Sequence, residues 1–153
     1  MTTEEMIRQE AVDDGAEVID MKLSSNIKGL YCDGVVAVNS NVPTSAERAC
    51  VLAEELGHHK TAAGVILDQR GSRNRKQELA GRVWAYDRLI GLAGIFRAIR
   101  AGCRSRYEMA EFLDVTEEML ADALVYYRRK YGTCAKYGKY MIYLDPLGVM
   151  ELF

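Results

Sequence analysis

The chain has 153 residues, of which 49% are hydrophobic and 27% charged, a composition typical of one globular domain with a small appended lobe. Its formal net charge of −2 excludes a general electrostatic attraction to nucleic acid or to an anionic membrane. No apolar run reaches the ~18 residues of a membrane span, the charged N-terminus lacks the apolar core of a signal peptide, and the four cysteines form no CxxC pair. We therefore expect a cytoplasmic protein with reduced thiols and no membrane partner.

The N-terminal part of the chain predicts a helix, a short extended stretch and a β-hairpin. Residues 3–15 follow a helical pattern with Thr3 as its cap. An Asp-Gly dipeptide, a strong two-residue turn signal, separates residues 29–32 from residues 35–39. Both of these runs favour β structure, so we expect them to pair as antiparallel strands.

Two helical segments are predicted in the middle of the chain. Thr44 and Glu47 have the spacing of a capping box, which predicts a helix that begins there and runs to about Lys60. Residues 61–72 have the composition of a loop. Residues 73–101 form a long helical segment, and two glycines near its centre favour a split into two helices.

The C-terminal part predicts a helix pair over residues 105–113 and 116–131, followed by two short strands within residues 139–153. The chain as a whole therefore predicts an α+β fold. We expect a helical core with a small antiparallel hairpin or sheet over residues 1–101. A helix-turn-helix-like pair and a β-hairpin over residues 102–153 would complete one compact unit.

The only two histidines, His58 and His59, are neighbours in the sequence LAEELGHH, late on the predicted central helix. Glu54 and His58 are four residues apart, so they share one helix face, and Glu55 projects beside them. In a zincin helix, H-E-x-x-H, positions 1 and 5 bind zinc and position 2 is the general base. Here a glutamate stands at position 1, and a carboxylate there would make the metal a poorer Lewis acid. The histidines would also suit a helix C-terminus without any metal.

The order of segments along the chain is similar to that of a known family. YCDGVVAVN, LAEELGHH, ILDQ, RKQELAGRVWAYDRLI and the helix pair follow one another between about residues 25 and 132. This order resembles the ImmA/IrrE family of metallo-endopeptidases, in particular its short phage and mobile-element members. The resemblance implies a zincin-like fold and a zinc-dependent hydrolase of gluzincin type. Its expected partner is a protein substrate such as a transcriptional repressor.

The resemblance also implies roles for individual residues. The family pattern E-x-x-A-[ND]-x-[FW]-A matches ELAGRVWA, which makes Glu78 the third zinc ligand. Glu55 takes the role of general base and His58 that of the retained histidine ligand. Glu54 occupies the position of the lost histidine ligand.

Arg82 stands where the family pattern has an acidic or amide residue, so this change and the glutamate at position 54 together swap charges. The two side chains would suit a bidentate Glu54–Arg82 bridge, which would weaken or remove the zinc site. The alternative function is then a catalytically inactive protein-binding module on the same scaffold. Two further residues are kept as possible contributors to the site: His59 as a second imidazole and Asp68 as an acid near the metal.

Residues 105–131 would also suit a DNA-binding helix pair. Thr116, Glu117 and Glu118 open the second helix, however, and acidic residues there would face phosphates. We therefore expect no DNA binding, and a DNA-binding regulator is the last of the three functions considered. The basic run over residues 70–76 favours a solvated loop over a rim that attracts an acidic substrate.

Overall fold

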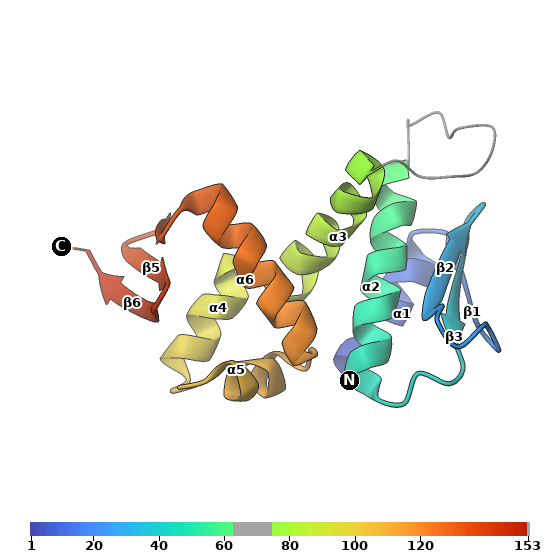
Figure 1. The fold of residues 1–153 in the computed structure, drawn as a ribbon, viewed down its shortest axis with the longest axis horizontal. Coiled ribbons are helices and arrows are strands. Elements are labelled where there is room, and N and C mark those ends of the chain that lie inside the picture. The colour runs from blue at the N-terminus through green and yellow to red at the C-terminus, as the bar shows by residue number, and fades with distance from the viewer. Residues whose placement is uncertain (63–74, 153) are drawn as a thin grey trace. The chain divides into compact units, whose positions relative to one another are not determined.

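The computed structural model describes residues 1–62 and 75–152. The chain divides into two compact units, unit 1 (residues 1–85) and unit 2 (residues 86–153). The described elements confirm the α+β class. In chain order (Figure 1) they are α1 (Thr3–Asp13), β1 (Glu17–Met21), β2 (Gly29–Cys32), β3 (Val35–Asn39), α2 (Ser45–Ala62), α3 (Arg75–Leu89), α4 (Gly91–Arg100), α5 (Arg106–Leu113), α6 (Glu117–Tyr131), β4 (Cys134–Tyr137), β5 (Tyr140–Leu144) and β6 (Leu147–Glu151).

The boundary between the units falls earlier than the predicted boundary after residue 101. Helix α4 groups with the C-terminal elements, because it packs against α5 and β6. Its left-handed first residue, Gly91 with φ of 60°, ends the long helical segment, and the predicted split is confirmed there. The candidate zinc-binding residues and the general base all belong to unit 1.

The sheet of unit 1 has the order β1-β3-β2. The predicted hairpin is confirmed, because β2 and β3 pair antiparallel with Leu30 opposite Ala37. Its turn residues Asp33 and Gly34 have φ values of 49° and 80°, the left-handed conformation that a two-residue hairpin turn requires. Strand β1 pairs with β3 in parallel, so the sheet is mixed and the prediction of an antiparallel sheet was incomplete.

Because β1 and β3 are parallel, the chain must reverse direction between β1 and β2. The side chain of Asn39 stabilises this connection, residues 22–28. Asn39 is 1% exposed, and its side-chain nitrogen donates to the carbonyl oxygens of Leu23, Ser24 and Ile27 at 3.2, 3.1 and 2.7 Å. A buried carbonyl group without a partner is costly, so one amide here stabilises a whole connection.

Helix α1 is capped one residue earlier than predicted. Thr2, rather than Thr3, is its cap: the Thr2 hydroxyl accepts the Glu5 N–H at 3.2 Å, and the Glu5 carboxylate accepts the Thr2 N–H at 2.8 Å. Only Thr2 has a glutamate three residues later, as a capping box requires, so the prediction of Thr3 was wrong for a reason visible in the sequence.

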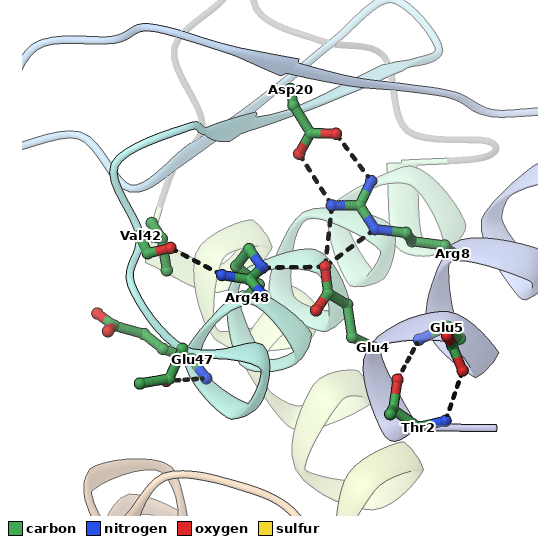
Figure 2. A network of polar contacts seen from close by, with 9 residues as sticks. Thr2, Glu4, Glu5, Arg8, Asp20, Val42, Glu47 and Arg48 are labelled. Atoms are coloured by element: carbon green, nitrogen blue, oxygen red, sulfur yellow. Dashed lines mark hydrogen bonds and ion pairs between the residues drawn. The ribbon is translucent and has the colours of Figure 1, made fainter.

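Four charged side chains tie α1 to α2 and to β1 (Figure 2). Glu4 accepts hydrogen bonds from Arg8 at 3.1 Å and from Arg48 at 3.0 Å, and Arg8 also donates to Asp20 at 2.8 Å. Burial alone would raise the pKa of Glu4. Hydrogen bonds from Arg48, Ser45 and Arg8 outweigh burial and hold that pKa below its ordinary value.

Helix α2 is the scaffold of unit 1, and α1, β2 and β3 pack against it. The Thr44 hydroxyl accepts the Glu47 N–H at 3.1 Å, which confirms the predicted cap. The apolar residues Ala49, Leu52, Ala53 and Leu56 recur at helical spacing along α2, and all four are fully buried. Charged residues interrupt α2, and none of the helices that the structure describes is long and apolar enough to cross a membrane.

Unit 2 contains the predicted helix pair, α5 and α6, with Ser105 and Thr116 as caps. Its sheet is an antiparallel meander, β4-β5-β6, whereas we expected two strands. The additional strand β4 pairs with β5 across a turn at Gly138, whose φ is 59°. Most of the late tyrosines pack within this unit; Phe96, for example, lies 4.7 Å from the Tyr140 ring, centroid to centroid.

Candidate functional site

Helices α2 and α3 come into backbone contact through two glycines. A Cβ atom built on Gly57 would lie less than 3.0 Å from the Gly81 carbonyl oxygen, a distance that real Cβ atoms do not show. Glycine in a helix interior costs about 1 kcal/mol relative to alanine, so this close approach has an energetic cost. Further along the two helices, the Lys60 ammonium lies 5.5 Å from the centroid of the Trp84 ring. Trp84 itself is half-buried.

The crossing brings together two of the predicted zinc ligands. The His58 Nε2 atom lies 3.4 Å from Glu78 Oε2. His58 is 5% exposed, whereas the Glu78 side chain is 45% exposed. A buried imidazole thus faces a carboxylate that solvent can reach.

The predicted general base, Glu55, lies on the side of α2 that faces β2. Its Cγ atom is 3.2 Å from the position that a Cβ atom would take on Gly29, the first residue of β2. The same Cβ atom would lie 2.5 Å from Val51 Cγ1. Glycine at position 29 therefore provides the space that the half-buried Glu55 side chain uses.

The third predicted ligand, Glu54, is half-buried on α2, one turn before His58. Among residues 1–62 and 75–152, no three side chains of His, Cys, Asp or Glu gather closely enough to hold a metal ion. The pair His58–Glu78 is therefore what the described structure brings together of the predicted ligand set. Arg82 is exposed in the second turn of α3, and its bridge to Glu54 stays a prediction.

His59 points to other partners. Its Nδ1 atom lies 2.9 Å from the Tyr31 hydroxyl, and its Nε2 atom lies 3.3 Å from Asp14 Oδ2. Consecutive helical residues project about 100° apart, which explains why two adjacent histidines have separate surroundings. His59 therefore joins α2 to β2 and to the end of α1, and it does not face Glu78.

Some predicted contributors lie outside the described residues: Asp68 and most of the basic run, residues 70–74. The last two residues of that run, Arg75 and Lys76, are exposed in the first turn of α3. Sequence reasoning missed the three glycines at positions 29, 57 and 81. The signal that could have found two of them is a glycine in the interior of an otherwise regular helical pattern.

The chemistry of the site follows from the His58–Glu78 pair. An imidazole nitrogen and a carboxylate oxygen at this separation can hold a cation between them or form an ion pair when the histidine is protonated. No model of a known protein family matches the chain, and no curated protein matches it.

Proposed function

We propose that the chain is a zinc-dependent metallo-endopeptidase similar to the ImmA/IrrE family, acting on a protein partner such as a phage or mobile-element repressor. One observation carries the proposal. Two atoms that bind a tetrahedral zinc ion, each at about 2.0–2.1 Å, lie about 3.4 Å from each other. The distance between His58 Nε2 and Glu78 Oε2 is 3.4 Å, so the pair fits two corners of such a site.

In this proposal His58 and Glu78 hold the ion, with Glu54 as the third ligand one helical turn before His58. Zinc would supply a Lewis acid and a water molecule of lowered pKa. Glu55 would be the general base, which accepts a proton from a water molecule and gives it to the leaving amine. Two carboxylates and one imidazole leave less positive charge on the ion than two imidazoles would, so we expect a weaker Lewis acid than in the H-E-x-x-H arrangement.

A second candidate function is a catalytically inactive protein-binding module on the same scaffold. It is favoured by the observation that the described residues gather two of the three ligands rather than three. In that case the His58–Glu78 contact is an ion pair that stabilises the crossing of α2 and α3.

Zinc analysis separates the two candidates. The protein is purified without added metal, and its zinc content and affinity are measured by mass spectrometry and by competition with a chromogenic chelator. We expect about one zinc per chain, an affinity at least about 100-fold lower after His58→Ala, and zinc retained after Glu55→Gln. Cleavage of a pool of quenched fluorescent peptides should be lost in both variants. A wild-type protein that takes up no zinc from zinc-containing buffer would contradict the peptidase and favour the binding module.

A further inference from the structure

The glycines at which neighbouring atoms leave no room for a side chain lie around the candidate site. Among the described glycines, a Cβ atom would come within 3.0 Å of another atom only at Gly29, Gly57 and Gly81. Gly29 and Gly81 meet side chains of α2 between Val51 and His58, and Gly57 belongs to the same part of α2. The missing side chains therefore shape the surroundings of the site rather than the chain in general.

We propose that Gly81 is a positioning residue that sets the His58 imidazole opposite Glu78. A Cβ atom on Gly81 would lie within about 3.0 Å of three ring atoms of His58, namely Nδ1, Cε1 and Cγ. The ring thus occupies the space that a side chain would fill, with its Nδ1 edge on the α3 backbone. The opposite edge carries Nε2, which faces Glu78 Oε2.

Helix α3 provides both Gly81, against which the His58 ring packs, and the Glu78 carboxylate. Gly81 follows Glu78 by three residues, so the two positions are neighbours on one face of α3. The distance between the imidazole and the carboxylate is therefore set by a single rigid helix. Moving α3 away from α2 to make room would give up the close packing of the two backbones at Gly57 and Gly81. A methyl group at position 81 must then move the ring itself by about 1 Å to reach ordinary van der Waals contact.

The positioning of His58 can be tested without metal, and only its consequence for zinc binding rests on the proposed function. The chain has two histidines, so nitrogen-15 NMR of histidine-labelled, metal-free protein shows two ring systems, which His59→Gln assigns. We expect Gly81→Ala to shift the ring signals of His58 and to leave those of His59 unchanged. The matched control is Gly94→Ala, at a buried helical glycine of unit 2. The nearest atom to the new Cβ there would be the end of the flexible Leu113 side chain, at 3.2 Å. This control should shift neither ring.

With zinc added, Gly81→Ala should lower the affinity at least about tenfold, whereas Gly94→Ala should not change it. Unchanged His58 ring signals in metal-free Gly81→Ala protein would overturn the proposal. If the wild-type protein binds no zinc but the His58 signals still move in Gly81→Ala, the positioning role is supported and the peptidase is contradicted.

Gly81→Ala has a second test if the protein does not fold. Because the expected clash is with the His58 ring, the double variant Gly81→Ala/His58→Ala should fold again, as judged by circular dichroism and thermal unfolding. A double variant that stays unfolded would mean that the methyl group meets something other than His58, and it would overturn the proposal.

Discussion

Helix α2 has two faces that use charge in different ways. Toward α1 its basic side chains meet acids: Arg48 Nε lies 3.0 Å from Glu4, and Lys60 and the His59 ring lie 3.4 and 3.3 Å from Asp14. These contacts hold the elements of unit 1 together. The arginine and lysine contacts are pairs of opposite charge within the chain, so this face is organised for stability.

Toward α3 the arrangement is reversed, because the two backbones meet directly through Gly57 and Gly81. The polar contact of this face is the buried His58 ring and the partly exposed Glu78 carboxylate. The α1 face thus uses charged contacts to join elements, whereas the α3 face uses the absence of side chains to place the buried His58 nitrogen beside a carboxylate that solvent can reach. Substitutions on the first face should change stability, and substitutions on the second should change zinc binding.

The largest effect on the α1 face is expected for Glu4→Ala. It leaves Arg8 and Arg48, whose side chains are 29% and 30% exposed, without their shared carboxylate. We expect the free energy of unfolding to fall by about 1.5–3 kcal/mol, measured by urea titration. The control Lys28→Ala breaks a more exposed pair with Glu47 and should cost less than about 1 kcal/mol. Zinc affinity should stay unchanged in both variants, and a loss of zinc in Glu4→Ala would remove the distinction between the faces.

The contribution of Glu4 to stability should depend on pH. The pKa of Glu4 is lowered in the folded protein, so its carboxylate stabilises the fold above its ordinary pKa of 4.5 and this contribution is lost as the pH falls through the lowered value. The difference in unfolding free energy between wild type and Glu4→Gln should therefore shrink between about pH 5 and pH 3. A difference that stays constant over this range would contradict the assignment.

Local signals predicted much of this fold correctly. The Asp-Gly turn at residues 33–34 defines the hairpin, and the caps at Thr44 and Thr116 define helix starts, because each acts on residues next to it in the chain. The parallel pairing of β1 was not predictable in this way. It depends on Asn39, whose side chain binds a connection that lies 12–16 residues earlier in the sequence.

The sequence proposes residues for the candidate site but does not predict its geometry. The spacing within α2 placed Glu54 and His58 on one face, and the resemblance added Glu78 as a ligand. Nothing in either pattern shows that Gly57 meets Gly81, because contact between two helices depends on how the whole of unit 1 packs. The arrangement of Glu54 relative to the other two ligands depends on the same packing.

A smaller effect on stability is expected for His59→Ala, and this variant tests whether the two adjacent histidines have different roles. The substitution removes the contacts of His59 with the Tyr31 hydroxyl at 2.9 Å and with Asp14 at 3.3 Å, and we expect a loss of about 1 kcal/mol in urea unfolding. Tyr31→Phe removes the hydroxyl contact alone and should cost part of that amount. Zinc affinity should stay at the wild-type level, unlike in His58→Ala. Zinc loss in His59→Ala equal to that in His58→Ala would place both rings in one site and refute the separation of the faces.

The smallest effect on stability is expected for Lys60→Met. Lys60 contacts residues on both faces of α2. Its ammonium lies 3.4 Å from Asp14 on the α1 side and 5.5 Å from the Trp84 ring centroid on the α3 side. Methionine keeps a long apolar side chain, so the change isolates the charge, and we expect a loss below about 1 kcal/mol. Salt of about 1 M screens exposed ion pairs, so the part of this loss that comes from Asp14 should disappear there. Trp84 is the only tryptophan of the chain, so a change in its fluorescence reports the part that comes from α3. Unchanged Trp84 emission, together with a loss of stability that disappears in salt, would assign Lys60 to the α1 face alone.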